Sequence, residues 1–332
     1  MWILCSTALG FLLDLCFGDP RWLPHPVVLI GKSISRLERF LRRKFPQTPE
    51  GERRAGVILA AAIPLGSLLL SLGILLLAYR ISFWLWFVLH TFWAYQILAA
   101  RCLERESDKV YRLLAAGDLP GARVQLSYLV GRDTTQLTAE EVTKACVETV
   151  AENTSDGVTA PLLYLMIGGV PLGFCYKAIN TLDSMVGYRN AKYLHLGRAS
   201  AKLDDAANWL PSRICGLLLT VSAFLLRLDG KNAWRIFRRD RRNHLSPNSA
   251  QTESAAAGAL GIQLGGTHIY FGDVVEKPTI GDAVRLADQR TFAAPMDDVC
   301  GVWFVAFGIW SAAVCRSAAV SMRRCAYAPA WR

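Results

Sequence analysis

The sequence is poor in charge, and it lacks the short motifs of common soluble enzymes. Charged residues make up 19% of the 332 positions, below the roughly 25% of a typical soluble domain. The nine cysteines include no CxxC pair, so neither a disulfide framework nor a zinc site is indicated. There is no GxxxxGK[ST] phosphate loop and no GxSxG nucleophile turn, which argues against a P-loop nucleotide site and a serine hydrolase.

What the sequence has instead is apolar residues, 52% of the total, gathered into runs. The runs cover residues 56–78, 83–100, 158–176, 209–226 and 299–315. A helix crosses a bilayer with about 20 apolar residues. The pattern therefore predicts an all-α, polytopic membrane helix bundle of about four or five spans, built as one membrane-embedded domain over residues 1–332. The apolar start, residues 1–17, has no basic leader and contains Asp14, so it is expected to be a membrane-associated or partly buried helix rather than a signal peptide.

Basic residues indicate how the bundle lies in the membrane. Eight Lys and Arg residues fall in 32–54 and four more in 101–112, on either side of the first two apolar runs. By the positive-inside rule both flanks are expected in the cytoplasm, at the cell inner membrane. Because these residues sit beside apolar runs, not on a soluble domain with stacking aromatics, we expect no nucleic-acid partner.

Three loops carry the polar chemistry, and all are expected to be helical and cytoplasmic: 101–157, 177–208 and 227–298. The run 158–176 conflicts with this, because a simple span there would place 177–208 outside the cell. Gly168-Gly169 and Pro171 interrupt it, so it is expected to be re-entrant. The basic run 227–242 is expected to form an interfacial helix, with Trp234 and Phe237 on its apolar side.

Acidic residues recur on one face of a helix predicted from a capping box at Thr138–Glu141. Glu148 and Glu152 are four residues apart, so they share a face of that helix. Asn153 and Asp156 lie at its end. Oxygen ligands of this kind suit Mg²⁺, although a solvated helix face paired with Lys144 would give the same pattern.

A second polar segment runs from Lys177 to Asn208 and carries both signs of charge. Such a stripe beside a membrane run is costly unless it is paired or used. The alternative is an interfacial helix with snorkelling side chains. A third segment, 246–266, combines Ser-Pro-Asn with spaced glycines. Glycine amides can cradle phosphate, but a plain loop is the favoured interpretation.

These segments resemble the CobD/CbiB family of cobalamin biosynthesis, the adenosylcobinamide-phosphate synthases. The resemblance is carried by FGDP at 17–20 with PHPV at 24–27, VGRDT at 130–134, 148–161, NTLDSMVGYRN at 180–190, 203–211, SPN at 246–248, and YFG at 270–272 with Lys277-Pro278. They run in family order over nearly the whole chain. One departure follows SPN, where the family usually reads close to AGWPEA and this chain keeps only Glu253.

The resemblance implies an ATP-dependent ligase that joins aminopropanol, or its O-phosphate, to the carboxylate of adenosylcobyric acid. The product would be adenosylcobinamide or its phosphate, formed through an acyl phosphate with ATP and Mg²⁺. The corrinoid, the amine, membrane lipid and other late cobalamin-assembly membrane enzymes would be its partners. An AmpE-like signalling protein that keeps the fold and loses the site is the alternative, and the retained polar motifs favour the enzyme. A transporter is disfavoured because the charges lie beside the spans and not at their centres.

Roles for single residues follow from chemistry and placement. Glu148, Glu152, Asp156, Asp183 and Asp204 are expected to hold Mg²⁺. Glu152, Asp205, Lys177 and Arg189 are expected to be catalytic, the carboxylates as proton acceptors and the cations as phosphate holders. Arg132, Asn153, Asn180, Arg198, Asn208, His25 and Asn248 are expected to bind substrate or ATP.

Overall fold

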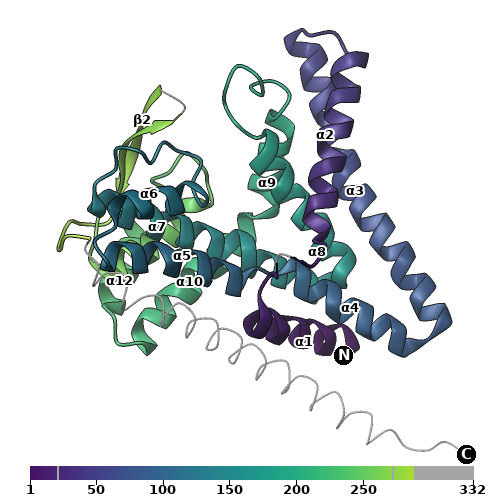
Figure 1. Ribbon diagram of the computed structural model, residues 1–332, viewed down its shortest axis with the longest axis horizontal. Coiled ribbons are helices and arrows are strands. Elements are labelled where there is room, and N and C mark those ends of the chain that lie inside the picture. Colours follow the sequence, from purple (N-terminus) through teal and green to yellow (C-terminus); the bar gives the residue numbers. More distant parts are fainter. Residues whose placement is uncertain (21, 271–272, 288–332) are drawn as a thin grey trace, which may run out of the picture.

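The computed structural model describes residues 1–20, 22–270 and 273–287, and the apolar run expected at 299–315 lies outside them. The described residues form helices almost throughout, together with one two-stranded hairpin (Figure 1). The helices are α1 Trp2–Phe17, α2 Pro26–Lys44, α3 Pro49–Ile81, α4 Phe83–Ile97, α5 Ala100–Ala115, α6 Leu119–Ser127, α7 Ala139–Thr154, η1 Ser155–Thr159, α8 Ala160–Val186, α9 Arg198–Ala207, α10 Trp209–Leu225, α11 Gly230–Asp240 and α12 Ser249–Leu260. The predicted helical bundle is confirmed.

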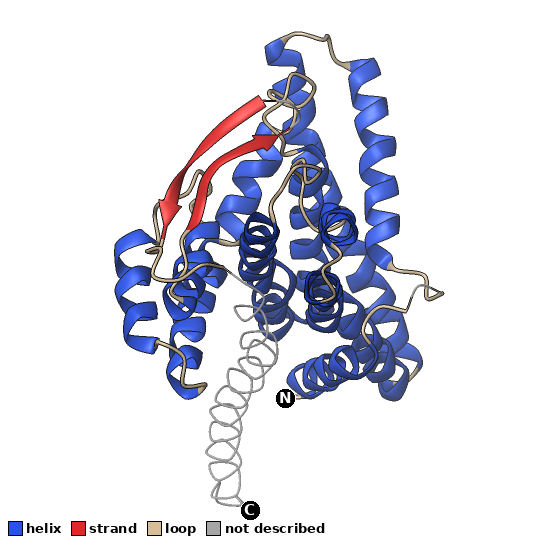
Figure 2. Cartoon of the chain, turned by 60° about the vertical axis from the view of Figure 1, so that its left-hand side comes forward, coloured by secondary structure: helices blue, strands red, loops and turns tan. Residues whose placement is uncertain are grey.

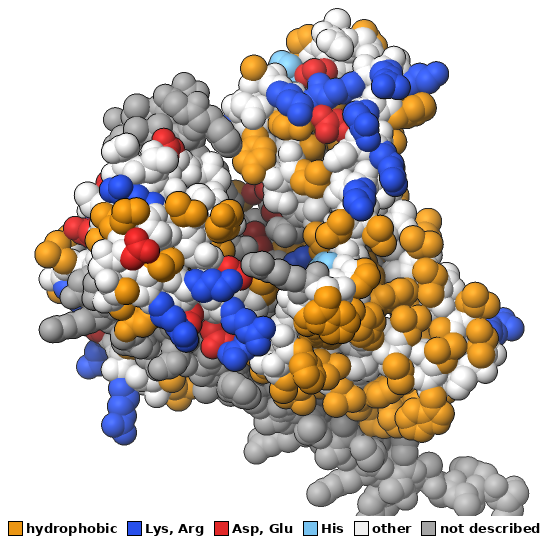
Figure 3. Space-filling model, in the orientation of Figure 1, with side chains coloured by type: hydrophobic (Ala, Val, Ile, Leu, Met, Phe, Trp, Pro, Cys, Tyr) orange, Lys and Arg blue, Asp and Glu red, His pale blue; other side chains and the backbone are white. Residues whose placement is uncertain are grey.

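The helical hairpin predicted from the first two apolar runs is α3 and α4. Thr48 begins α3 by accepting the Gly51 N–H, and Ser82 begins α4 by accepting the Trp84 N–H, both at 3.2 Å. Three helical stretches are long and apolar enough to cross a membrane: Pro49–Ile81, Phe83–Ala115 and Ala139–Val186. A fourth is possible if α9 and α10, bent by 48° at their junction, count as one. Apolar side chains cover the part of the surface that α1, α3 and α4 form, and Lys and Arg gather at the far tip of α2 and α3 (Figure 3).

The apolar N-terminal segment forms α1, which packs against α4. The ring of Trp2 meets that of Phe83 edge-on, with centroids 5.3 Å apart. Asp14 is fully buried, and its Oδ2 accepts the backbone N–H of Ala100 at 2.8 Å, at the first residue of α5. The prediction of a partly buried helix is confirmed. Asp14, the one ionisable carboxyl group of α1, caps the start of α5 by accepting its first backbone N–H.

The predicted break in 158–176 lies inside α8. Gly168 and Gly169 leave the helical conformation, and Gly169 has φ 66°. The N–H of Val170 then donates to His90 Nε2 at 3.1 Å, so Nδ1 of that ring carries the proton and faces Ser6 Oγ at 2.9 Å. A broken helix inside a membrane requires partners of this kind for its backbone. The side of the membrane that each half of α8 faces stays a prediction.

The segment after α10 differs most from expectation. A plain loop was expected over 246–266, and the structure has α12 followed by an antiparallel hairpin of β1 Leu264–Tyr270 and β2 Asp273–Ile280 (Figure 2). The small residues of α12 allow close helix packing. A Cβ on Gly258 would lie 2.7 Å from Ala233 Cα of α11. In α11, Phe237 is buried against α10, where a Cβ on Gly216 would meet its ring, whereas Trp234 is 42% exposed. The position of α11 at a membrane surface stays a prediction.

Candidate functional site

The site is built around a single wider helical turn. The helix that begins at the confirmed capping box of Thr138 and Glu141 continues from α7 through the π-helical turn η1 into α8. Such turns hold one extra residue and often occur at functional sites. Asp156 lies in this turn, and its carboxylate accepts hydrogen bonds from Asn208 Nδ2 and from Asn180 Nδ2, the latter at 3.4 Å. Ser155 Oγ donates to Asn208 Oδ1 at 3.0 Å.

Three carboxylates act on Asp156, and a fourth, Asp205, acts on two of those three. The charges of Asp204, Glu152 and Asp183 all act on Asp156, and Asp205 acts on Asp183 and Asp204. These side chains come from α7, η1, α8 and α9, which follow one another along the chain between residues 139 and 207. Like charges held together away from water require a shared proton or a cation between them. The structure therefore brings together most of the acidic residues that the sequence singled out.

Two buried polar atoms in this acidic cluster have no hydrogen-bond partner among the described residues. They are Asp204 Oδ1 and the hydroxyl oxygen of Tyr176, whose ring stacks on Tyr164 at 4.9 Å. Buried polar atoms are rarely left unpaired, so these two atoms are able to accept a contact from a bound group. Over the described ranges, no group of three or more His, Cys, Asp or Glu side chains is already arranged to hold a metal ion. The Mg²⁺ assignments stay predictions.

Glu152 connects this acidic cluster to α12. Its Oε1 accepts the hydroxyl of Ser249 at 2.7 Å. Next to it, Asn248 is 5% exposed, and its Oδ1 accepts the Ser212 hydroxyl at 3.2 Å while its Nδ2 donates to the carbonyl of Asp205 at 3.0 Å. Asn248, predicted to bind substrate, thus joins α9 and α10 through its side chain.

Glu148 lies one turn before Glu152, in a different setting. Its Oε2 pairs with Arg132 Nη2 at 3.2 Å, and its Oε1 accepts the backbone N–H of Gly265 in β1 at 2.8 Å. The Arg132 side chain is only 4% exposed, and its Nε and Nη1 have no partner among the described residues. The two glutamates predicted as one metal-binding pair therefore have different partners.

Glu253 and His244 join this region, and sequence reasoning gave neither a role. Burial raises the pKa of Glu253 well above its usual range, and the Glu152 and Glu148 carboxylates raise it further. Burial lowers the pKa of His244, and the Lys277 charge lowers it too. The signal for Glu253 was its retention after SPN, whereas no local pattern points to His244 or Tyr176.

Lys177 stands on the other side of Asp156, toward the FGDP loop. It is half-buried, and its charge interacts with Asp19, Asp156 and Asp14. The FGDP loop is fixed by Tyr95, whose hydroxyl donates to the Gly18 carbonyl. The FGDP motif therefore lies next to the site, through Asp19 and Lys177.

The remaining predicted residues lie at the edge of the site or outside it. His25 begins α2 by accepting the Val27 N–H at 3.2 Å, with its Nε2 3.6 Å from Asp19. Arg189 is exposed, and its charge acts on Asp205. Asn153 donates to the Thr149 carbonyl of its own helix, and Arg198 is exposed at the start of α9. In the view of Figure 3, acidic atoms are visible at the bottom of the hollow between the two parts of the surface.

Comparison with known proteins places this arrangement in a family. The model of the family described as CobD/Cbib protein matches residues 7–297. The chain is 55% identical over 284 residues to the cobalamin biosynthesis protein CobD of Geobacter metallireducens, covering 85% of this chain and 87% of that one. It is 48% identical over 291 residues to CobD of Listeria monocytogenes (87% and 91%) and 44% identical over 310 residues to CbiB of Salmonella arizonae (93% and 97%). No solved structure matches it significantly. The chain therefore belongs to the CobD/CbiB family and is a helical membrane protein of cobalamin biosynthesis.

Proposed function

We propose that the chain is an ATP-dependent ligase that forms an amide between the carboxylate of adenosylcobyric acid and aminopropanol or its O-phosphate. One observation carries the proposal: Asp156 is held by Asn180 and Asn208 inside a group of half-buried and buried carboxylates, and the Lys177 charge acts on the same group. This arrangement supplies both signs of charge at one place. An AmpE-like signalling role would not need these groups.

The chemistry needs an activated acid, because a carboxylate at neutral pH is a poor electrophile. Transfer of the γ-phosphoryl group of ATP to the carboxylate would give an acyl phosphate and ADP. The neutral amine would then attack the acyl carbon, inorganic phosphate would leave, and a base would take the ammonium proton. Phosphoryl transfer depends mainly on positioning and charge neutralisation, which are properties that fixed charges provide.

The acidic cluster supplies carboxylate oxygens, the unpaired and buried Asp204 Oδ1 among them, which are the ligands that a hard divalent cation takes, and holding the ion would require these side chains to converge further. Asp156, Asp183, Asp204 and Glu152 would hold Mg²⁺, which neutralises phosphate charge when bound. Lys177 and Arg189 would bind phosphate oxygens. Asp205 or Glu152 would accept the proton from the amine, and Asn180 and Asn208 would keep the Asp156 carboxylate in place.

The test is direct synthesis by the purified protein in detergent. Adenosylcobyric acid, ATP and Mg²⁺ would be combined with aminopropanol or with its phosphate, and the amide would be measured by mass spectrometry. We expect an ATP-dependent amide with at least one of the two amines. A protein that is folded and makes no such product with either amine would refute the proposal, as would product formation without ATP.

A further inference from the structure

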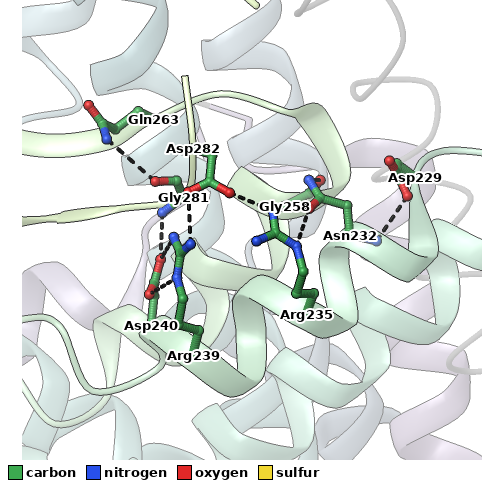
Figure 4. Close-up of polar contacts among 9 residues, drawn as sticks. All are labelled: Asp229, Asn232, Arg235, Arg239, Asp240, Gly258, Gln263, Gly281 and Asp282. Carbon is green, nitrogen blue, oxygen red and sulfur yellow. Dashed lines mark hydrogen bonds and ion pairs between the residues drawn. The ribbon is translucent and has the colours of Figure 1, made fainter. Parts of the chain in front are cut away.

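A network of ion pairs fixes the end of the β-hairpin to α11 (Figure 4). Asp240 is 3% exposed, and its carboxylate accepts hydrogen bonds from Arg239 Nε at 2.7 Å and Nη2 at 2.8 Å. The same carboxylate accepts the backbone N–H of Gly281 at 2.8 Å. Arg239 also reaches Asp282 Oδ1 at 2.8 Å, and Arg235 binds the other oxygen of Asp282. Gly281 and Asp282 directly follow β2, so this network, the α11 clamp, acts on the hairpin's last strand.

The hairpin needs such an anchor. A lone two-stranded hairpin is marginally stable in water. Leu264 and Ile280, which pair at the open end of this hairpin, are fully buried in the protein. Gly281 has φ 84°, and a Cβ there would lie 2.4 Å from the Ile262 carbonyl oxygen, so the chain turns sharply at the clamp. Exposed ion pairs contribute little, but a two-pronged Arg bond to a buried carboxylate is among the stronger contacts.

The hairpin brings two groups to the candidate site. Gly265 in β1 donates its N–H to Glu148. Lys277 lies in β2 opposite Gly266, and its charge acts on both His244 and Glu253. Lys277 precedes Gly281 by only four residues on the chain. The clamp therefore holds one end of β2. This strand carries the Lys277 cation on the side of the site where Glu148 and Glu253 lie.

We propose that Arg239 and Asp240 are positioning residues, and that Lys277, held in place through them, binds an anionic group of the reactants. The role of Lys277 rests on the proposed ligase function, whereas the clamp itself does not. The basic run 227–242, which looked like a membrane-surface helix in sequence, would thus act on the site through protein contacts.

The clamp is tested by hydrogen–deuterium exchange of the full chain in detergent. Arg239→Gln is compared with Arg238→Gln, the adjacent arginine, whose guanidinium lies over Trp234 with 5.9 Å to the ring centroid. We expect exchange in 264–280 to rise by about tenfold in Arg239→Gln, as for the loss of a charge-assisted hydrogen bond, and to be unchanged in Arg238→Gln. Arg239→Lys should restore part of the protection. Equal exchange in the two glutamine variants would overturn the clamp.

The role of Lys277 is tested by the KM and kcat of amide formation. Arg239→Gln and Lys277→Met should each raise the KM for one phosphate-bearing or carboxylate reactant more than they lower kcat. The double variant should be no worse than Lys277→Met alone, because both act through the same group. The role of Lys277 would be overturned if the KM increases of the two single variants multiplied in the double variant. It would also be overturned if the variants lowered kcat and left KM unchanged. If the wild-type chain forms no amide, the ligase proposal fails, and the exchange experiment still decides the clamp.

Discussion

Polar side chains inside the protein have different roles in the apolar part of the molecule and in the candidate site. Among α1, α4 and the first half of α8, buried Asp14 and His90 each accept a backbone N–H at a helix start or break. Around η1 and α9, the carboxylates of Asp156, Asp183 and Asp204 act mainly on one another. The first kind completes the hydrogen bonding of the fold. The second kind exceeds what the fold needs, and such an excess indicates function.

Replacing Asp156 should have the largest effect and most directly test this contrast. Asp156→Asn keeps an oxygen for the Asn208 bond and removes one charge from the acidic cluster. We expect amide formation to fall by roughly a hundredfold or more, with a thermal midpoint unchanged or raised because repulsion is relieved. Mass spectrometry of product and thermal unfolding in detergent would measure the two. Glu140→Gln, in the preceding helix α7 and paired with Lys144, is the control. A wild-type rate for Asp156→Asn would contradict the prediction.

Removing His90 should affect stability without a direct effect on chemistry. In His90→Ala the Val170 N–H loses its acceptor in apolar surroundings, at a cost of about 1–3 kcal/mol. Thermal unfolding should show a lower midpoint, and activity per folded molecule should be retained. His195→Ala, in the loop before α9, is the matched control. Equal midpoints for the two variants would show that His90 does not support the break.

Asp14 offers a smaller test of the same kind. Asp14→Ala removes the acceptor at the start of α5, with an expected cost of about 0.5–2 kcal/mol. Asp14→Asn keeps an acceptor oxygen, so its loss should be smaller. Comparing the unfolding midpoints of the two variants separates hydrogen bonding from charge. If both variants unfold alike, the capping interpretation is wrong.

Glu253 should produce the smallest effect, a change in how stability depends on pH. Its pKa is raised by burial and by nearby carboxylates, so the folded chain keeps this proton to a higher pH than the unfolded chain. Its stability contribution is complete below the ordinary glutamate pKa and is lost as pH rises toward the raised value. Glu253→Gln should therefore flatten the fall in unfolding midpoint that begins as the pH rises above the ordinary glutamate pKa. Glu140→Gln should keep the wild-type slope, and two parallel profiles would contradict the assignment.

Local signals in the sequence predicted the elements that depend on local physics. The α3–α4 hairpin followed from run length, the start of α7 from its capping box, and the break at Gly168 and Gly169 from the lack of a Cβ. Lys177, Asn180 and Asp183 were expected in one polar segment, 177–208, because polar residues of both charge signs gather there beside an apolar run. Each of these depends on residues within a few turns of one another.

The rest depends on contacts between distant segments, which no local pattern encodes. Glu148 and Glu152 looked like one pair, yet Gly265, 117 residues away, accounts for one partner of Glu148. The small residues of α12 resembled a loop because their packing against α11 is not visible in the sequence. His244 and Tyr176 had no signal, since only the tertiary fold brings them to the carboxylates.

The π-helical turn at Ser155–Thr159 has a consequence for how the family can vary in length here. An α-helix rotates by about 100° and rises about 1.5 Å per residue. Deleting one residue from this turn would restore a regular helix and rotate Asp156 relative to Glu152 on one side and Asn180 on the other. Insertions and deletions should therefore be tolerated in the loops between helices. They should not be tolerated between Glu152 and the start of α8, because the number of residues there sets the orientation of Asp156 relative to Glu152 and Asn180.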